Sequence, residues 1–251
     1  MMRYTIRYVS LLAGMLTVFS SCEHKDLCFD HEAHAPKSDV HVKAVYEKEW
    51  EHTCEGGPDW EQYPAWESRF GMEYHELCPD APDGLRVQVY NEDGTNNILN
   101  VAPEGDIVRM RPGEHSLLLY NNDTEYIVFD DMNSFASAKA TTRTRTRASY
   151  AGNPYMENTV ENTVNAPDML YGNYMENYTA ERKIEADELP VTMHPLVFTY
   201  LVRYEFSHGL EYVALARGAL AGMAGAVWLN SGRTSEEAAT ILYDCSVEDF
   251  G

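Results

Sequence analysis

The feature that most constrains the fold is a series of short stretches in which apolar and polar residues alternate, separated by turn-forming residues. Residues 39–46 (DVHVKAVY) set Val40, Val42 and Ala44 against polar neighbours. Comparable stretches follow at residues 85–90, 97–101, 107–111, 116–121 and 125–129. Alternation with a period of two gives a strand one buried face, and short strands with turns at about every 8–12 residues are typical of a β-sandwich. We therefore expect residues 39–147 to form an all-β N-terminal domain.

Residues 50–83 interrupt this series with a long stretch that is rich in tryptophan and contains four prolines. We expect a short helix near residues 60–74 within it. A loop this long is usually functional or mobile, and aromatic side chains with a polar edge are favoured at interfaces. The rings that would form a surface for a glycan or a partner protein are Trp50, Trp60, Tyr63, Trp66 and Tyr74. The alternative is a satellite core beneath the loop.

The composition changes between residues 134 and 167, where alanine, threonine, asparagine and serine replace the apolar residues. Within this part, residues 142–147 read TRTRTR, and alternation places Arg143, Arg145 and Arg147 on one face of an edge strand. The first interpretation of these arginines is a solvated face, because charged side chains protect an exposed sheet edge. We expect residues 148–167 to be an interdomain linker.

A second β region is expected over residues 168–251. Its most strand-like stretch is residues 197–206 (VFTYLVRYEF), with further strands at residues 226–229 and 239–245. Residues 214–223 are rich in glycine and alanine, and we expect a short helix or turn there. Because few strands follow the linker, we expect a partial C-terminal β-sandwich that exposes a sheet edge beside residues 197–206.

The first 21 residues have the pattern of a secretory signal peptide. Arg3 and Arg7 precede an apolar run at residues 9–19, and two serines follow it. A positive head, a short apolar run and small residues are typical of an export signal. The run is too short to span a bilayer, which needs about 20 apolar residues. We therefore expect export of the chain.

The residues before Cys22 resemble the lipobox of bacterial lipoproteins, with Phe19 where leucine is more usual. That resemblance implies cleavage before Cys22 and acylation of its sulfur and its amino group. A single acyl chain holds a protein only marginally, so several chains on one residue would form a durable anchor. Residues 22–38 would then be a lipidated polar tether.

A zinc site is the competing interpretation of this tether, through His24, Cys28, His31 and His34. Structural zinc sites have more regular Cys and His spacings. Acylation would also prevent the Cys22 sulfur from binding a metal ion, so we predict no metal. The cysteines that remain are even in number, which permits disulfides in an exported protein but does not fix their pairing. They are Cys28, Cys54, Cys78 and Cys245, of which Cys54 and Cys78, both within residues 50–83, are the favoured pair.

Acidic residues outnumber basic ones by 40 to 19, which gives a formal net charge of −21. Such a charge repels phosphate backbones and anionic headgroups, so nucleic-acid binding is disfavoured. The sequence contains no G-x-S-x-G, H-E-x-x-H or phosphate-loop motif. We therefore predict neither an enzyme nor a cofactor, and we expect lipid alone to hold the chain at the membrane.

Four segments together resemble the fimbrillin-like lipoproteins of Bacteroidales, close to the fimbrial anchor and accessory subunits. They are residues 22–31 (CEHKDLCFDH), 118–129 (LLYNNDTEYIVF), 166–172 (APDMLYG) and 217–229 (RGALAGMAGAVWL). The resemblance implies tandem transthyretin-like (Greek-key) β-sandwiches on an outer-membrane lipid anchor at the cell surface, with the second sandwich incomplete here. It also implies a structural role in cell adhesion, as an anchor or accessory subunit of a surface fimbria.

The same resemblance implies two steps of assembly. Related fimbrillins are matured by proteolysis after an arginine, which makes Arg143, Arg145 and Arg147 candidate processing sites, although they follow the first domain rather than its first strand. They polymerise when a partner's strand fills an exposed groove, so fimbrial subunits are expected partners by strand addition. The alternative function is a surface lipoprotein that binds a glycan or a protein through residues 50–83. The sequence leaves open a shaft, anchor or tip role.

Overall fold

The computed structural model divides the chain into two units, Met1–His34 and Ala35–Gly251. It describes residues 38–46, 65–77, 79–102, 104–146 and 161–246, all of them in the second unit. Within this described part, no helix has the length and apolar character needed to cross a membrane.

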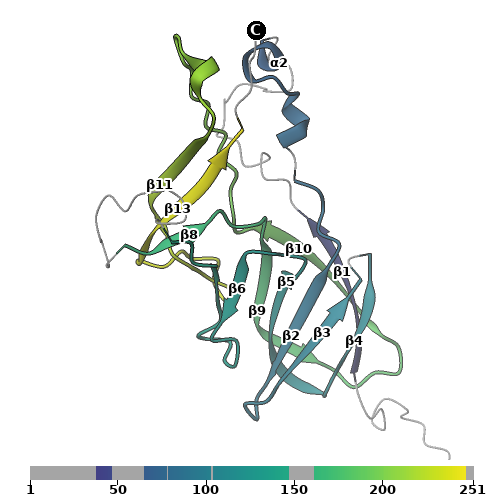
Figure 1. The fold of residues 1–251 in the computed structure, drawn as a ribbon. Coiled ribbons are helices and arrows are strands. Elements are labelled where there is room, and N and C mark those ends of the chain that lie inside the picture. Colours follow the sequence, from purple (N-terminus) through teal and green to yellow (C-terminus); the bar gives the residue numbers. More distant parts are fainter. Residues whose placement is uncertain (1–37, 47–64, 78, 103, 147–160, 247–251) are drawn as a thin grey trace, which may run out of the picture. The chain divides into compact units, whose positions relative to one another are not determined.

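The largest sheet has seven strands in the order β3-β2-β5-β9-β10-β1-β4 (Figure 1). They are β1 (Ser38–Tyr46), β2 (Leu85–Asn91), β3 (Asn96–Val101), β4 (Asp106–Met110), β5 (Gly113–Asn121), β9 (Tyr171–Ala180) and β10 (Asp187–Pro195). β1 is parallel to β10, and all other neighbouring strands in this sheet are antiparallel. The first described strand therefore lies inside the sheet, with a partner on each side.

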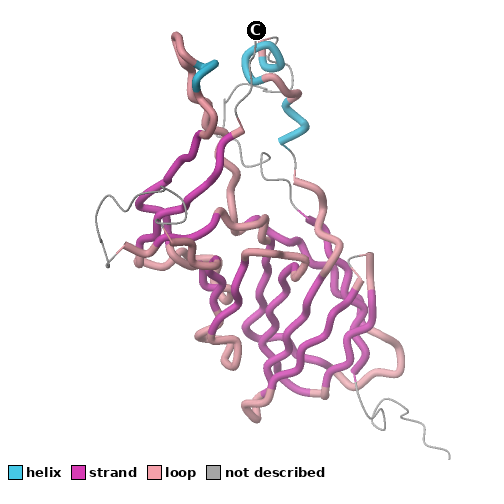
Figure 2. The backbone as a smooth tube through the Cα atoms, in the orientation of Figure 1, coloured by secondary structure: helices cyan, strands magenta, loops and turns pink. Residues whose placement is uncertain are grey.

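Two smaller sheets have three strands each, so strands dominate the described chain (Figure 2). The order β12-β7-β6 joins β6 (Ile127–Asp130), β7 (Lys139–Thr142) and β12 (Val227–Trp228). The order β11-β13-β8 joins β8 (Thr163–Asn165), β11 (Ala216–Ala224) and β13 (Ala238–Cys245). The helical elements described are short: α2 (Trp66–Phe70), η3 (Tyr74–Leu77) and η4 (Leu210–Tyr212). The expected all-β class is confirmed.

One hydrophobic core is formed by alternate residues of the seven-stranded sheet. Val40 and Val42 of β1 are fully buried in it, as is Leu117 of β5. Other members come from β2, β4, β9 and β10: Leu85, Val87, Val89, Val108, Met110, Tyr171, Ala180, Val191 and Met193. The period-two pattern of residues 39–46 thus predicts the buried face of β1 correctly, because successive side chains of a strand point to opposite faces.

A second core lies against the opposite face of β2 and β5. Leu118 and Tyr120 of β5 are buried there together with Tyr90 of β2. They pack with apolar residues of β6, β7 and β12 and the segments beside them: Ile127, Ala138, Ala140, Leu170, Val227 and Leu229. Because residues 117–120 of β5 (LLLY) are buried on both faces, they form a continuous apolar run rather than an alternating one.

Two polar side chains join the segment around residue 170 to the strands β5 and β6. One carboxylate oxygen of Asp168 accepts hydrogen bonds from the backbone N–H groups of Glu125, Tyr126 and Ile127, at 2.8, 2.5 and 3.3 Å. The buried Asn121 at the end of β5 accepts the N–H of Tyr171 at 2.7 Å. These bonds satisfy backbone donors that the sheets leave unpaired, and so fix where β9 begins.

The expected boundary at residues 148–167 does not separate the strands into two sheets. β9 and β10 follow that stretch, yet they lie between β5 and β1 in the seven-stranded sheet. Part of the stretch is itself a strand, since β8 pairs with β13. The pairing of β9 with β5 and of β10 with β1 is non-local, so the composition change near residue 134 could not indicate it.

Two predicted elements of the C-terminal part are also corrected. Residues 197–206 form no strand. No described strand pairs with them, and a strand needs partners as well as propensity. Residues 216–224 form β11 instead of a helix or turn. Gly218 of β11 pairs with Tyr243 of β13, and a Cβ atom at Gly218 would lie 2.1 Å from the Tyr243 ring. Glycine there lets an aromatic ring cover the strand, which favours the sheet.

Candidate functional site

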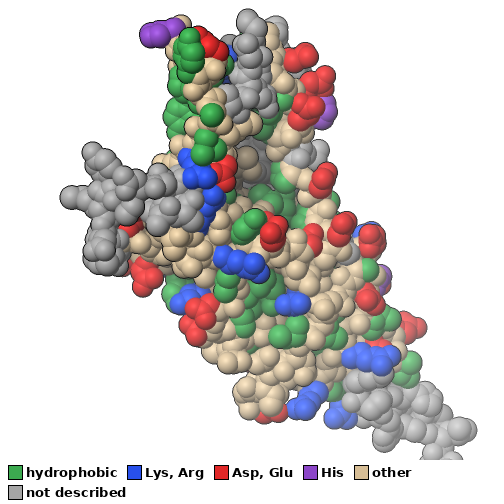
Figure 3. Space-filling model, in the orientation of Figure 1, with side chains coloured by type: hydrophobic (Ala, Val, Ile, Leu, Met, Phe, Trp, Pro, Cys, Tyr) green, Lys and Arg blue, Asp and Glu red, His purple; other side chains and the backbone are tan. Residues whose placement is uncertain are grey.

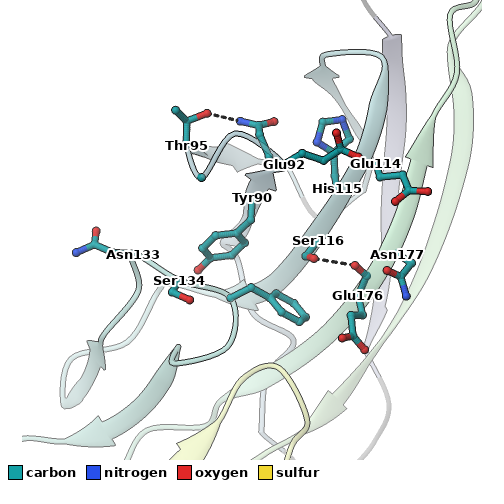
Figure 4. A pocket seen from close by; sticks show the side chains of 13 residues that line it. Tyr90, Glu92, Thr95, Glu114, His115, Ser116, Asn133, Ser134, Glu176 and Asn177 are labelled. Atoms are coloured by element: carbon teal, nitrogen blue, oxygen red, sulfur yellow. Dashed lines mark hydrogen bonds between the residues drawn. The ribbon is translucent and has the colours of Figure 1, made fainter.

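An open cleft of about 420 Å³ lies where β2, β5 and β9 meet the turn between β2 and β3 and the loop before β7 (Figure 4). Most of its lining residues are of polar type, although the lining exposes polar and apolar area in about equal amounts, and they come from segments far apart in the sequence. The lining residues are Tyr90, Asn91, Glu92, Gly94, Thr95, Glu114, His115, Ser116, Asn133, Ser134, Phe135, Glu176 and Asn177.

A tight turn between β2 and β3 forms one wall of the cleft. The N–H of Asn91 donates to the carbonyl of Thr95 at 2.8 Å, and the Asn91 side-chain amide donates to the Thr95 hydroxyl at 2.9 Å. Gly94 has a φ of 78°, a left-handed conformation that glycine adopts without strain. Hydrogen bonds from Thr95, and then the Arg111 guanidinium at 2.9 Å, hold the pKa of Asp93 below its ordinary value. Residues 91–94 (NEDG) are turn-forming residue types, and the turn that they make is well bonded.

A bulge in β9 forms the opposite wall. His115 pairs with Tyr178 and Leu117 pairs with Met175, so Glu176 and Asn177 together face Ser116 alone. The Ser116 hydroxyl donates to the carbonyl of Glu176 at 2.7 Å (Figure 4). Bulges of this kind re-aim side chains and are common beside functional sites. Here both bulged residues line the cleft.

Two aromatic residues, Tyr90 and Phe135, lie between these walls. Tyr90 and Phe135 meet edge to face, with ring centroids 5.9 Å apart. The Tyr90 hydroxyl donates to the carbonyl of Met132 at 2.9 Å, and burial of the ring raises the pKa of Tyr90. The buried side-chain amide of Gln88 donates to the same carbonyl at 2.7 Å. This part of the cleft is therefore fixed by the second core.

The charge of the cleft is negative. Glu92, Glu114 and Glu176 are exposed, and none of the described residues lining the cleft is lysine or arginine. No group of three His, Cys, Asp or Glu in the described ranges is placed to share a metal ion. The arrangement suits hydrogen bonding to a polar ligand.

A second surface feature is the segment between β10 and β11, residues 197–215, which we call the apolar arm. Phe198, Tyr200, Val202, Tyr204 and Phe206 occur at alternate positions, and all are exposed, Tyr200 to 69%. The arm is held at its base, where Leu196 and Val197 pack on the second core. The Tyr204 and Tyr243 hydroxyls are 3.0 Å apart. In Figure 3, hydrophobic side chains gather on this arm.

Among the described strands, the sheet that follows the arm ends at β11. β11 is the last strand in the order β11-β13-β8, and no other described strand pairs with its outer side. Asp244 of β13 accepts from Arg217 at 3.1 Å and from Arg145 at 2.8 Å. An open edge presents unpaired N–H and C=O groups that another strand can use.

The predicted aromatic surface is described only in part, because Trp50, Trp60 and Tyr63 lie outside the described residues. Trp66 and Tyr74 are half-buried and pack on each other, with ring centroids 4.9 Å apart. Phe70 packs on Trp66 at 4.4 Å. Much of the Trp66 ring is therefore used within its own short helical segment, and neither ring lines the cleft.

The predicted arginine face is replaced by a bonded connection between sheets. β7 ends at Thr142, and only an isolated bridge from Thr144 to Val164 follows. The N–H of Arg145 donates to the carbonyl of Thr163, and the Arg145 guanidinium pairs with Asp244, whose pKa is lowered chiefly by that hydrogen bond. Arg143 is exposed, and Arg147 lies outside the described residues.

The lipidation site and the proposed metal ligands also fall outside the described part of the chain. They are Cys22, His24, Cys28, His31 and His34. Cys54 and Cys78 are outside it as well, and Cys245 at the end of β13 is a free thiol. The sequence does not predict the cleft, because only its turn at residues 91–94 has a local signal, whereas the bulge and the loop at residues 132–135 depend on non-local pairing.

Comparison with known proteins identifies relatives for most of the chain. The family described as "Domain of unknown function (DUF5119)" matches residues 64–244. A curated relative, "Putative fimbrium anchoring subunit Fim4B" of Bacteroides ovatus, is 27% identical over 178 residues, which are 69% of this chain and 50% of that protein. The chain thus spans about half the length of this relative.

One solved structure shows the same fold class. A crystal structure titled "putative adhesin" from Bacteroides ovatus has a TM-score of 0.55 at 21% identity, over 89% of this chain and 66% of the other. A second structure with that title, also from Bacteroides ovatus, has a TM-score of 0.46 at 11% identity, over 88% of this chain and 64% of the other. Because the family match covers most of the sequence, this chain belongs to the DUF5119 family.

Proposed function

We propose that this protein is a lipid-anchored subunit of a surface fimbria, acting at the outer membrane as an anchor or accessory component in cell adhesion. The observation that carries the proposal is the apolar arm beside an open sheet edge. The relative named as a fimbrium anchoring subunit supports the same role.

Strand addition explains why the arm and the edge would occur together. The open side of β11 offers backbone hydrogen bonds to an incoming strand, and side chains at alternate positions decide which strand fits. Phe198, Tyr200 and Val202 would supply apolar area that is otherwise exposed to water. Burying apolar area contributes about 25 cal/mol per Å². A partner subunit that covers the arm would therefore gain both kinds of interaction.

The experiment that tests this role uses charged substitutions in the arm. The double variant Tyr200→Asp, Val202→Asp is expressed in the cell that makes the fimbriae, and the fimbriae are then sheared off. The amount of full-length chain recovered with them should fall by about tenfold or more. The reason is that burying an unpaired carboxylate in an interface is costly. Ile184→Asp is the control, since Ile184 is an apolar residue that is also exposed and lies outside the arm, between β9 and β10. Normal recovery of the arm variant would contradict the proposal.

The lipid anchor is tested separately at Cys22. We expect Cys22→Ala to release the protein from membranes, because the acyl chains would be lost. Mass spectrometry of the wild-type protein from membranes should show an acylated N-terminal Cys22. If the Cys22→Ala variant stays membrane-bound and is processed normally, the proposed lipid anchor is wrong.

A glycan- or protein-binding role through residues 50–83 is the weaker proposal. Its described rings, Trp66 and Tyr74, already pack against each other and Phe70. That packing favours a satellite core over an open platform.

A further inference from the structure

β1 and β10 are parallel neighbours in the seven-stranded sheet, and each is continuous with a segment that the proposed function puts under tension (Figure 1). Cys22 precedes β1 in the sequence, so tension on a lipid anchor would enter that strand at Ser38. The apolar arm follows β10, so tension on the arm would enter that strand at Pro195. Because the strands are parallel, these two points are at opposite ends of the pair. The two tensions therefore act along the strands in opposite directions.

The pairing of β1 with β10 is continuous over most of both strands. It runs from Val40 beside Asp187 to Tyr46 beside Met193, with every residue between them in register. When the two strands are pulled in opposite directions, all hydrogen bonds of this ladder are stretched together. If both strands were pulled from the same end, the bonds would break one after another. The topology therefore distributes tension between Cys22 and the arm over the whole ladder.

Pro190 of β10 does not interrupt this ladder. Just past the strand, the N–H of Leu196 donates to the carbonyl of Leu170. The carbonyl of Thr192 accepts from the side-chain amide of Asn173 in β9 at 2.6 Å. Backbone groups of successive residues point to opposite sides of a strand, so the even-numbered residues of β10 direct theirs toward β9. The N–H that proline lacks would therefore point away from β1.

Side chains reinforce the pair on both faces of the sheet. Val42 of β1 and Val191 of β10 are buried in the core of the large sheet, and exclusion of water strengthens the hydrogen bonds beside them. On the opposite face, Nδ1 of His41 lies 2.9 Å from a carboxylate oxygen of Glu188, its neighbour in the register. β1 also pairs with β4 on its other side. A pull on β1 is therefore resisted by two ladders.

The described pairing of β10 with β9 is limited to two residues, His194 and Pro195, so tension that enters β10 passes mainly to β1. We propose that β1 and β10 form a mechanical clamp, which carries the pull between the lipid anchor and the fimbria. The clamp rests on the proposed function, because that function assigns the two points where tension enters. Most of the large sheet, including β2, β3 and β5, lies outside this path.

Single-molecule force spectroscopy of the full-length chain tests the clamp without membranes or fimbriae. A click-reactive amino acid in place of Cys22 holds one handle, and another in place of either Tyr200 or Ile184 holds the second. Both of these positions are exposed, and Ile184 precedes β10, so a handle there pulls the two strands from the same end. At the same constant force, the first rupture should take at least about tenfold longer with the handle at position 200, a factor that corresponds to about 1.4 kcal/mol of barrier. Equal lifetimes in the two geometries would overturn the clamp, whereas failure of the fimbrial role would appear in the shearing experiment instead.

Two core variants locate the resistance to force. With handles at positions 22 and 200, Val42→Ala should shorten the lifetime by about threefold or more, because buried contacts of the clamp are lost. Val87→Ala is the matched control and should shorten it less, since Val87 is equally buried in the same core but belongs to β2. Denaturant titration of both variants separates this effect from a general loss of stability. If Val87→Ala shortens the lifetime as much as Val42→Ala at equal stability, the pull does not pass through β1 and β10.

Discussion

Two tyrosines at the ends of the first two strands differ in what their hydroxyl groups contact. Tyr46 of β1 packs edge to face on Tyr171, with ring centroids 5.2 Å apart. Its buried hydroxyl has no hydrogen-bond partner among the described residues. The Tyr90 hydroxyl donates to the carbonyl of Met132 instead. Tyr46 therefore contributes through its ring, and Tyr90 through both its ring and its hydroxyl.

We expect Tyr46→Phe to leave the free energy of unfolding at neutral pH within about 0.5 kcal/mol of wild type. Tyr90→Phe should lower it by about 1 kcal/mol, since a carbonyl loses a donor. Denaturant titration of the two variants measures both values. A loss at Tyr46 as large as that at Tyr90 would show that the Tyr46 hydroxyl has a partner after all.

Tyr46→Phe should also change how the free energy of unfolding depends on pH. Burial, followed by the charge of Asp123, raises the pKa of Tyr46 to about 12. The unfolded chain releases a phenol proton near pH 10, while the folded chain retains it. The unfolded state therefore binds fewer protons above pH 10, and the stability falls as the pH rises toward 12. Tyr46→Phe should show a smaller alkaline loss in denaturant titrations, and an unchanged loss would contradict the assignment.

At the scale of elements, β5 is the strand that joins the two cores. Leu117 faces the core of the seven-stranded sheet, and Leu118 faces the core shared with β6, β7 and β12. Both side chains are fully buried. The small sheet thus stabilises the large one through residues on the opposite face of a shared strand.

Alanine substitutions on the two faces test this arrangement. Leu117→Ala and Leu118→Ala should each lower the free energy of unfolding by about 2–4 kcal/mol, through lost burial and a residual cavity. Ile184→Ala, at a residue 63% exposed, should change it by less than about 0.5 kcal/mol. If Leu118→Ala costs no more than Ile184→Ala, the sheet of β6, β7 and β12 does not pack on β5.

Sequence patterns predict the local elements well and their partners poorly. The strands expected at residues 39–46, 85–90 and 97–101 correspond to β1, β2 and β3. Residues 197–206 have equal strand propensity but no partner in the described chain, and the small residues of β11 form a strand because Tyr243 covers Gly218. The cleft depends on the β9 bulge, whose existence follows from pairing with β5. Propensity is local, whereas pairing is decided by the whole chain.

At the scale of the molecule, strands from both halves of the sequence complete one sheet, while the segment after β10 carries exposed apolar side chains. The large sheet is supported by its own core and by the second core, so it does not need the arm. The arm contributes its base to the second core, and the exposed residues beyond that base are available to a partner. This division between a supported scaffold and an exposed segment is the basis of the assembly proposal.

Hydrogen exchange of the full-length chain, followed by mass spectrometry before and after incorporation into fimbriae, tests that proposal most directly. In the isolated chain, amides of β5 and β9 should exchange slowly, because both strands have partners on each side. Amides of Tyr200, Val202 and Phe206 should exchange rapidly in the isolated chain, since they lie in no strand, and become protected in the fimbria. Protection of these three amides before assembly, or none gained on assembly, would contradict the account.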